Sequence, residues 1–553
     1  MRTLTPLLVV LLVACARAGS PAAGPPRDGG DSGGPLLPEQ AAYDVLHYAL
    51  TLAVDPDERA IEGSLTVRAR ALEPLERFVL DLDGRLQVRG VTGGDGALPF
   101  EHRDGRIWIE LPAPAPVGAQ LELTVDYGGR PRVAPRPPWD GGLSWERTED
   151  GEPWIATSCQ GQGADLWWPC KDHPSDKPEG MDLVITVPRG LFCASNGVLV
   201  SDQETAAGRR LHWQVRSPIS NYAVALNIAP YETLEHRFES VSGEAFPVTF
   251  WVLPENLEEA REVFPEFLDH LRFFEELLGP YPFRAEKYGI AETPHLGMEH
   301  QTVIAYGNEY RRDRFDYDSL HHHELAHEWF ANLVTCRDWK DMWLHEGFGT
   351  YMQALYVERN HGPEAYRTHM QSTRRGLRNR RPVAPRETRS AGQIYFGGAA
   401  GFDNDIYNKG ACVLHTLRWL LGDETFFTFL RRMAYPDPAL ERVTDGSQVR
   451  LVDTEDCRRL AESIAERDLA WFFEVYLRQP RLPELKAVRR VDALELSWEV
   501  PVEVEFPLPV PVRVGRGDDA VMHRVEMPAG RGSLSLPPGT AYAVDPDRWL
   551  LRD

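Results

Sequence analysis

The chain has 553 residues, which is too long for a single hydrophobic core, so we expect two to four domains. Apolar residues make up 42% of the chain and aromatic residues 10%, values typical of a globular protein and not of a disordered one. The formal net charge of −23 argues against nucleic-acid binding and against electrostatic attachment to anionic lipid.

The first residues resemble an export signal. One early cation precedes an apolar run that is too short to cross a bilayer and is typical of a secretory signal. The run ends in LVAC, which is similar to the lipobox of bacterial lipoproteins, so residues 1–15 would be the signal and Cys15 the lipidation site. A Gly/Pro/Ser-rich flexible tether would then occupy residues 16–37. We expect a lipid anchor in the bacterial cell envelope, at the outer membrane or the periplasmic face; cleavage after Ala18, giving a soluble secreted or periplasmic protein, is the alternative.

Alternating apolar and polar residues begin near residue 43. Two such runs flank the turn DPDER, which indicates a β-hairpin, and similar runs continue to about residue 235 with turn residues between them. We therefore expect an all-β N-terminal domain over residues 38–235.

The apolar period changes near residue 254. Residues 254–279 place apolar side chains at helical offsets and close with Gly279-Pro280, and helical patterns continue from there. Strand patterns return after residue 483. A mainly helical domain over residues 236–482 and a small β domain over residues 483–553 follow from these patterns.

Six cysteines remain after the predicted signal: Cys159, Cys170, Cys193, Cys336, Cys412 and Cys457. An exported protein can pair some of them, and Cys159 with Cys170, the closest in sequence, is the first pair to test. No C-x-x-C occurs, so the sequence does not indicate a thiolate zinc site.

The segment HHHELAH contains the H-E-x-x-H pattern of a zinc site. His323 and His327 are four residues apart and share one face of a helix, with Glu324 beside them to act on a water molecule. His321 and His322 have no partner at that offset, so we expect them on the helix surface or behind the ligands.

Two histidines do not complete a catalytic zinc site, which normally takes three protein ligands and leaves one position open. Glu346 is the candidate third ligand, with eighteen residues between it and His327, in an apolar helical setting. The spacing predicts one zinc ion bound by His323, His327 and Glu346.

At this point the sequence resembles the zinc aminopeptidases related to aminopeptidase N and to leukotriene epoxide hydrolase. HELAHEWFANLVT followed by WKDMWLHEGF is similar to their zinc segment nearly throughout, and the resemblance extends from about residue 40 to the end. It implies a multidomain α+β fold with an N-terminal β-saddle domain, a thermolysin-like, mainly α catalytic domain of the gluzincin type, and a small C-terminal β-sandwich. The large C-terminal helical domain usual in the family has no counterpart in the sequence.

The resemblance also implies roles for individual residues. HLGMEHQTVIAYG is similar to the exopeptidase motif of the family, whose glutamate, here Glu299, binds the free α-amine of the substrate; Gly297, Met298 and His300 would lie along the substrate. Gln160 stands where a polar residue of the N-terminal domain helps to hold the substrate's N-terminus.

Two further residues complete the implied machinery. Glu324 would take a proton from the attacking water and deliver it to the leaving amine. Tyr407 matches the family's tyrosine that donates a hydrogen bond to the developing oxyanion, and such a bond is often worth about 3 kcal/mol.

Four positions depart from the family pattern. His300 replaces an asparagine, Leu296 a small residue, His345 an asparagine, and Gln353 an acid on the same helical face as Glu346. We expect these changes to alter contacts with the substrate and the support of the ligands, and not the metal itself.

The sequence therefore predicts a zinc-dependent aminopeptidase that hydrolyses the N-terminal peptide bond of peptides with a free N-terminus, without nucleic-acid partners. The alternatives are a catalytically altered family member that binds peptides, or an endopeptidase or epoxide hydrolase on the same zinc site. Neither of these last two activities needs Glu299.

Overall fold

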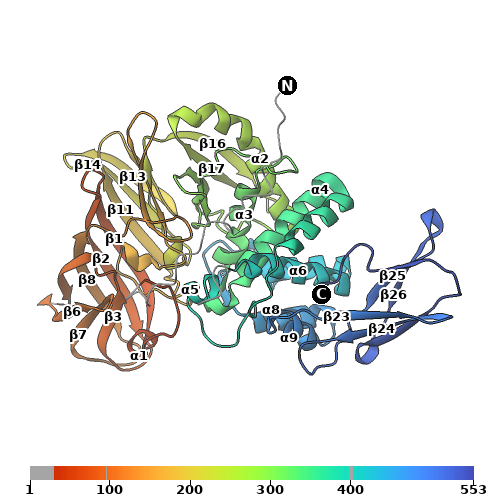
Figure 1. Ribbon diagram of the computed structural model, residues 1–553. Helices are drawn as coiled ribbons and strands as arrows, with labels where there is room; N and C mark the ends of the chain where they lie inside the picture. Colours follow the sequence, from red (N-terminus) through yellow and green to blue (C-terminus); the bar gives the residue numbers. More distant parts are fainter. Residues whose placement is uncertain (1–29, 95, 398–402) are drawn as a thin grey trace. The chain divides into compact units, whose positions relative to one another are not determined.

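The computed structural model describes residues 30–94, 96–397 and 403–553 (Figure 1). They form two compact units: residues 30–339, 388–397 and 434–451 make the first, and residues 340–387, 403–433 and 452–553 the second. The predicted signal, with Cys15, lies outside the described residues. Among those described, no helix combines the length and apolarity that crossing a bilayer requires. The predicted domain boundaries at residues 235 and 482 stay predictions.

The first unit begins with the predicted β-rich region. Its largest sheet has eight strands in the order β13-β14-β11-β1-β2-β8-β4-β5. These are β1 (Tyr43–Asp55), β2 (Ala60–Ala71), β4 (Leu86–Gly93), β5 (Gly96–Ala97), β8 (Gln120–Gly129), β11 (Gly180–Val187), β13 (Val198–Thr205) and β14 (Gly208–Val215). The predicted hairpin is confirmed, because β1 and β2 pair antiparallel with Leu50 opposite Leu65, and both side chains are buried.

Two smaller sheets complete this region. One has the order β3-β7-β6 and the other β12-β15-β10-β9. Their strands are β3 (Leu75–Asp81), β6 (Phe100–Arg103), β7 (Arg106–Ala115), β9 (Gly142–Arg147), β10 (Pro153–Ser158), β12 (Phe192–Ala194) and β15 (Asn227–Ala229), and the short helix α1 (Pro38–Ala41) precedes them. Trp167 and Trp168 are fully buried here and pack against each other, so they are core residues.

A five-stranded mixed sheet with helices packed on it follows in the same unit. Its order is β16-β17-β18-β20-β19, with β16 (Glu232–Glu239), β17 (Ala245–Val252), β18 (Tyr288–Glu292), β19 (Gly297–Met298) and β20 (Ile304–Tyr306). The predicted helix is α2 (Leu257–Leu278), which ends where Gly279 adopts a φ of 105°. Both α2 and α3 (Ser319–Ala326) pack on this sheet and against each other.

The second unit contains the remaining long helices and the C-terminal strands. The helices are α4 (Trp343–Arg375), α6 (Asp405–Leu421), α7 (Asp423–Ala434), α8 (Thr454–Ala465) and α9 (Ala470–Leu477). Two three-stranded sheets follow, β23-β24-β27 and β26-β25-β28. Their strands are β23 (Glu484–Arg489), β24 (Ala493–Glu499), β25 (Val510–Val514), β26 (Val521–Val525), β27 (Arg531–Ser535) and β28 (Tyr542–Val544).

Two glycines set how closely α4 and α6 pack. A Cβ on Gly347 would lie 2.9 Å from the Cα of Gly410, and one on Gly410 would lie 2.8 Å from the Cα of Gly347. Such distances are too short for real atoms, so the two helices meet backbone to backbone at this point. Glu346 directly precedes one of these glycines, and Tyr407 lies one turn before the other.

The candidate disulfide between Cys159 and Cys170 is not formed. Both thiols are free and buried, and the other four cysteines downstream of residue 30 are buried as well. Burial raises the pKa of Cys159 and of Cys170, with neighbouring aspartates adding to the effect, and raises the pKa of Cys193 to about 12. These neutral thiols are packing groups and poor nucleophiles.

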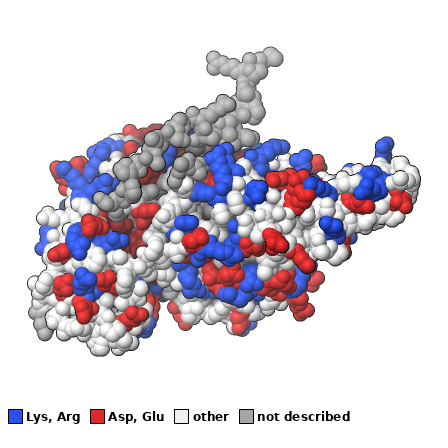
Figure 2. Space-filling model, turned by 60° about the horizontal axis from the view of Figure 1, so that its bottom comes forward, with Lys and Arg blue, Asp and Glu red and all other residues white. Residues whose placement is uncertain are grey.

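Surface charge agrees with the composition. On the face drawn in Figure 2, positive and negative side chains of the described residues alternate without a large basic field.

Candidate functional site

Helix α3 places the H-E-x-x-H residues, as predicted. Asp318 caps its start, because its carboxylate accepts a hydrogen bond from the backbone N–H of His321 at 2.9 Å. The Tyr306 hydroxyl donates to the same carboxylate at 2.5 Å, which ties the cap to strand β20. Helix α3 ends at Ala326, and His327 caps its C-terminus. The backbone leaves helical geometry altogether at Phe330.

The two predicted histidine ligands converge. Nε2 of His323 lies 3.2 Å from Nε2 of His327. The other ring nitrogen of His327, Nδ1, donates to the carbonyl oxygen of Phe330 at 3.0 Å. The lone pair of this ring is therefore on Nε2, where it can bind a metal. Two imidazole nitrogens at this separation, one of them oriented through its second nitrogen, fit a shared zinc ion.

Of the two positions expected for His321 and His322, the helix surface is wrong, and a position behind the ligands stays a prediction. Both side chains are fully buried. The His321 ring stacks on Phe267 at 3.7 Å, and its Nε2 lies 2.9 Å from the hydroxyl of Tyr288. Burial lowers the pKa of His321, so the ring is neutral. These histidines belong to the core between α2 and α3, because their side of α3 is enclosed by other elements, whereas His323 on the same turn is only half-buried.

Glu324 and Glu299 lie in one small region with His327. One ligand atom of each lies within 4.8 Å of the others, and all three side chains are buried. Strand β19 passes directly beside Glu324, since a Cβ on Gly297 would lie 2.6 Å from its Oε1. Only glycine fits at residue 297 while the carboxylate keeps this position.

The carboxylate of Glu299 is held by donors from distant parts of the first unit. The Nε2 of Gln160 donates to Oε1 of Glu299 at 2.6 Å, and the hydroxyl of Tyr222 donates to the same oxygen at 2.9 Å. The hydroxyl of Tyr395 donates to Oε1 of Gln160 at 2.8 Å, so the amide presents its N–H side to Glu299. We call Glu299, Gln160, Tyr222 and Tyr395 the Glu299 cluster. The sequence indicated Gln160 but missed both tyrosines.

The backbone of Glu299 is tied to the segment that follows α3. Nδ2 of Asn332 donates to the carbonyl oxygen of Glu299 at 3.0 Å and to Oε2 of Glu328 at 3.2 Å. The Nζ of Lys177 donates to the carbonyl oxygen of Asn332 at 2.7 Å. Burial lowers the pKa of Lys177 to about 7. Asn332 therefore links the backbone at Glu299 to the segment that follows α3.

The remaining residues of the predicted exopeptidase motif are buried. Gly297 and Met298 form β19, the edge strand of its sheet, paired on one side only with β20. An edge strand offers backbone groups to an extended peptide. His300 is fully buried, and burial, reinforced by His295, lowers its pKa to about 3, so its ring is neutral.

Glu346 and Tyr407 are in the second unit. Glu346 lies in the first turn of α4 and is buried, and Tyr407 lies in the first turn of α6 and is half-buried. The glycine contact between α4 and α6 fixes the two turns relative to each other within this unit. His345, next to Glu346, is also fully buried.

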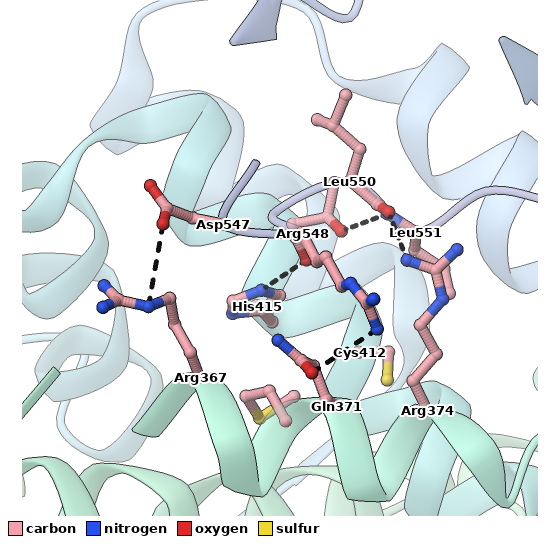
Figure 3. A pocket seen from close by; sticks show the side chains of 11 residues that line it. Arg367, Gln371, Arg374, Cys412, His415, Asp547, Arg548, Leu550 and Leu551 are labelled. Atoms are coloured by element: carbon pink, nitrogen blue, oxygen red, sulfur yellow. Dashed lines mark hydrogen bonds and ion pairs between the residues drawn. The ribbon is translucent and has the colours of Figure 1, made fainter. Parts of the chain in front are cut away.

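A small pocket in the second unit is separate from these residues. It is lined by α4, α6 and the C-terminal segment (Figure 3). Arg374 donates to the carbonyl oxygen of Leu550 at 3.0 Å, and Nε2 of His415 lies 3.2 Å from the carbonyl oxygen of Arg548. Its polar side chains hold the end of the chain on the helices, and none of the predicted site residues lines it.

Two family models match this chain, one in its N-terminal part and one in its central part. The family model "Peptidase M1 N-terminal domain" matches residues 44–223, and "Peptidase family M1 domain" matches residues 284–435. The chain is 26% identical to endoplasmic reticulum aminopeptidase 1 of Homo sapiens over 72% of its length and 45% of the relative. It is 28% identical to aminopeptidase B of Rattus norvegicus over 72% and 63%, and 27% identical to leukotriene A-4 hydrolase of Xenopus laevis over 70% and 64%. The chain thus spans less than two thirds of the length of these relatives.

Solved structures give a more complete match. An M1 zinc metallopeptidase mutant from Deinococcus radiodurans, bound to a Tyr-Ser-Ala substrate, superposes with a TM-score of 0.66 at 26% identity, covering 82% of this chain and 98% of that one. A two-domain M1 zinc metallopeptidase mutant bound to L-arginine gives a TM-score of 0.64, also at 26% identity, covering 82% and 98%. The fold class expected from the sequence is confirmed by these matches.

Proposed function

Because the chain belongs to the peptidase M1 family, we propose that it is a zinc-dependent aminopeptidase that removes residues from the free N-terminus of peptides. Zinc is the cofactor indicated by the family and by its solved members. We also propose the role of each residue in this reaction.

The observation behind the proposal is the closeness of two buried carboxylates. Glu299 and Glu324 have oxygens within 4.8 Å of each other and of His327. In a peptide, the amine nitrogen and the first carbonyl carbon are only about 2.5 Å apart, as the N–Cα and Cα–C bond lengths dictate. An ammonium bound to Glu299 therefore leaves room beside Glu324 for the first peptide bond and for no later one.

We assign the zinc ligands as His323, His327 and Glu346. The two histidines meet at their Nε2 atoms, and Glu346 is assigned from its spacing and the family match. The bound ion would supply Lewis acidity that polarises the scissile carbonyl and acidifies a water molecule.

The chain's own groups would perform the remaining steps. Glu324 takes the proton of the attacking water and passes it to the leaving amine. Tyr407 donates a hydrogen bond to the oxyanion. Glu299, with Gln160 and Tyr222 holding its carboxylate, fixes the substrate ammonium, while Gly297 and Met298 align the backbone along β19.

One experiment separates this activity from its alternatives. A peptide with a free N-terminus and the same peptide acetylated are digested in parallel and followed by mass spectrometry over time. We expect sequential loss of residues from the free peptide only. Replacing Glu299→Gln should lower kcat/KM by about 10²–10³-fold with zinc retained, since a buried ion pair to the ammonium is lost.

Other outcomes of the same digest assign a different function. Equal cleavage of both peptides at an internal bond would make the protein an endopeptidase and leave Glu299 without its proposed role. Binding of the free peptide without cleavage would make it a peptide-binding family member. If neither peptide is cleaved and a separate assay shows hydrolysis of an epoxide substrate, the third alternative is assigned.

We also propose, from the sequence alone, that the mature protein is anchored in the cell envelope through lipidated Cys15. The LVAC motif and the tether that follows support this. Mass spectrometry of the mature N-terminus should find a diacylated or triacylated cysteine; an unmodified terminus at Gly19 would contradict the proposal.

A further inference from the structure

The last part of the predicted tether is held against the first unit. The segment Asp31–Ser32–Gly33, which we call the docked segment, contains a serine that is only 2% exposed. Gly33 forms an isolated β-bridge with Ser390, just before helix α5 (Ala391–Tyr395). A Gly-rich linker without a partner would form neither contact.

Its first set of contacts fixes the start of α5. The carboxylate of Asp31 accepts hydrogen bonds from the backbone N–H of Gly392 at 2.7 Å and from the Ser390 hydroxyl. The carbonyl oxygen of Ser32 accepts from the N–H of Ala391 at 2.9 Å. The last residue of this short helix is Tyr395, whose hydroxyl orients the amide of Gln160 in the Glu299 cluster.

Its second set of contacts reaches two other supports of Glu299. The N–H of Ser32 donates to the carbonyl oxygen of Gly161, the neighbour of Gln160, at 3.3 Å. Nε1 of Trp339 donates to Oγ of Ser32 at 3.1 Å. The Trp339 ring packs edge to face on Tyr222 with ring centroids 5.5 Å apart, and Tyr222 donates to Glu299.

The fit of the docked segment is specific at Gly33. This residue has a φ of +75°, and a Cβ there would lie 2.4 Å from Cδ1 of Trp339. The backbone therefore lies directly on the indole ring, in a conformation that side chains other than glycine's rarely adopt.

We propose that the docked segment is a positioning element of the amine-binding site. By contacting α5, Gly161 and Trp339, it sets Tyr395, Gln160 and Tyr222. Gln160 and Tyr222 hold the Glu299 carboxylate, and Tyr395 orients Gln160. This inference rests on the proposed aminopeptidase function and adds residues to it that lie far from Glu299 in the sequence.

The expected consequence is an effect on substrate binding more than on turnover. The ammonium is held in both the ground state and the transition state, so a misplaced Glu299 weakens both by a similar amount. Such a loss of uniform binding raises KM and leaves kcat nearly unchanged.

The test compares three alanine variants of the full chain on a free-amine aminoacyl reporter. Gly33→Ala introduces the collision with Trp339. Gly34→Ala has the same kind of positive φ, +84°, but its nearest atom is 3.8 Å away, and Gly30→Ala meets nothing within 4 Å. We expect Gly33→Ala to raise KM about tenfold, which corresponds to the loss of roughly one charge-assisted hydrogen bond. The KM values of both controls should stay close to that of the parent.

A second variant and a second readout guard against loss of fold. Asp31→Asn removes the charge facing Gly392 and Ser390 while keeping the shape, and should also raise KM with zinc content and melting temperature unchanged. Hydrogen exchange of residues 160–163 and 388–395 should be faster in Gly33→Ala than in Gly34→Ala.

The outcomes separate the inference from the proposed function. A parent protein inactive on the reporter would contradict the proposed function, and the exchange data would still decide whether the docked segment orders these two stretches. An active parent with unchanged KM in both Gly33→Ala and Asp31→Asn would overturn the inference. An equal loss in Gly33→Ala and Gly34→Ala would do so too, because strain alone would then explain it.

Discussion

Two buried glutamates of the first unit have different surroundings and are assigned different tasks. Glu299 accepts hydrogen bonds from Gln160 and Tyr222, so its carboxylate is fixed in place as a receptor for a cation. Glu324 lies on the zinc helix beside Gly297, where the absence of a Cβ leaves room for its carboxylate. A fixed carboxylate suits binding, and one beside the metal ligands suits proton transfer.

The task of Glu324 can be tested with a matched pair of substitutions. Glu324→Gln should keep about one zinc per chain and lose about 10²–10⁴-fold in kcat, the range of general acid–base catalysis. Glu364→Gln, which changes an exposed carboxylate of α4 that has no part in the proposed site, is the control. Similar losses in both variants, measured by kinetics and metal analysis, would contradict the assignment.

The residues that the sequence predicted well are those whose positions depend on local geometry. His323 and His327 meet because a helix brings residues four apart onto one face, whatever the rest of the chain does. Tyr222 and Tyr395 could not be predicted, because each reaches the Glu299 cluster through the tertiary fold. For His321, the helix surface was one of two positions expected from the lack of a partner at a helical offset, and it was wrong because Tyr288 and Phe267 enclose the ring.

Among the secondary-structure elements, the periodic ones were predictable and their packing was not. Helix α2 was predicted almost to the residue, since an apolar stripe and a terminal Gly279 mark it. Strand β19 was not, because two residues give no alternation to detect. The contact of α4 with α6 depends on Gly347 and Gly410, whose helical surroundings in the sequence do not show what they face.

For Gly410→Ala, helix propensity and steric collision predict opposite changes in stability. By helix propensity alone, Gly410→Ala would stabilise α6 by about 1 kcal/mol. The new Cβ would instead lie 2.8 Å from the Cα of Gly347, so we expect a destabilisation of about 1–3 kcal/mol from overpacking. Because Glu346 and Tyr407 are placed by this crossing, kcat should fall as well.

Chemical unfolding and steady-state kinetics measure both effects. Gly84→Ala is the control, since a Cβ there meets nothing within 4 Å, and its unfolding free energy should stay within about 0.5 kcal/mol of the parent. A Gly410→Ala variant that is more stable than the parent would show that α4 and α6 adjust without cost.

At the scale of the whole molecule, composition and charge bear on the class of protein more than on its partners. A net charge of −23 argues against a polyanionic partner, and that expectation stays a prediction. The order of β-rich, helical and β-rich regions was predictable from changes in apolar period. The division into two compact units was not, because residues 388–401 and 434–451 belong with the first unit and lie in sequence among residues of the second.

The zinc assignment makes a prediction about the stability of the whole chain. A ligand that binds only the folded state adds RT ln(1 + [L]/Kd) to the unfolding free energy, about 2.7 kcal/mol when the free ion is at 100 times its Kd. Removing zinc with a chelator should therefore lower the melting temperature of the parent, and adding zinc back should restore it. Glu346→Ala should start lower and respond little to either treatment.

The same helix offers a control for that experiment. Glu364→Ala removes an exposed carboxylate of α4 and should melt, lose zinc and recover like the parent. If Glu346→Ala shows the full response to chelation and zinc, Glu346 is not a ligand, and the third position must be filled by another group. If the parent does not respond at all while metal analysis shows that zinc was removed, the ion contributes to catalysis without contributing to folding stability, contrary to what we predict.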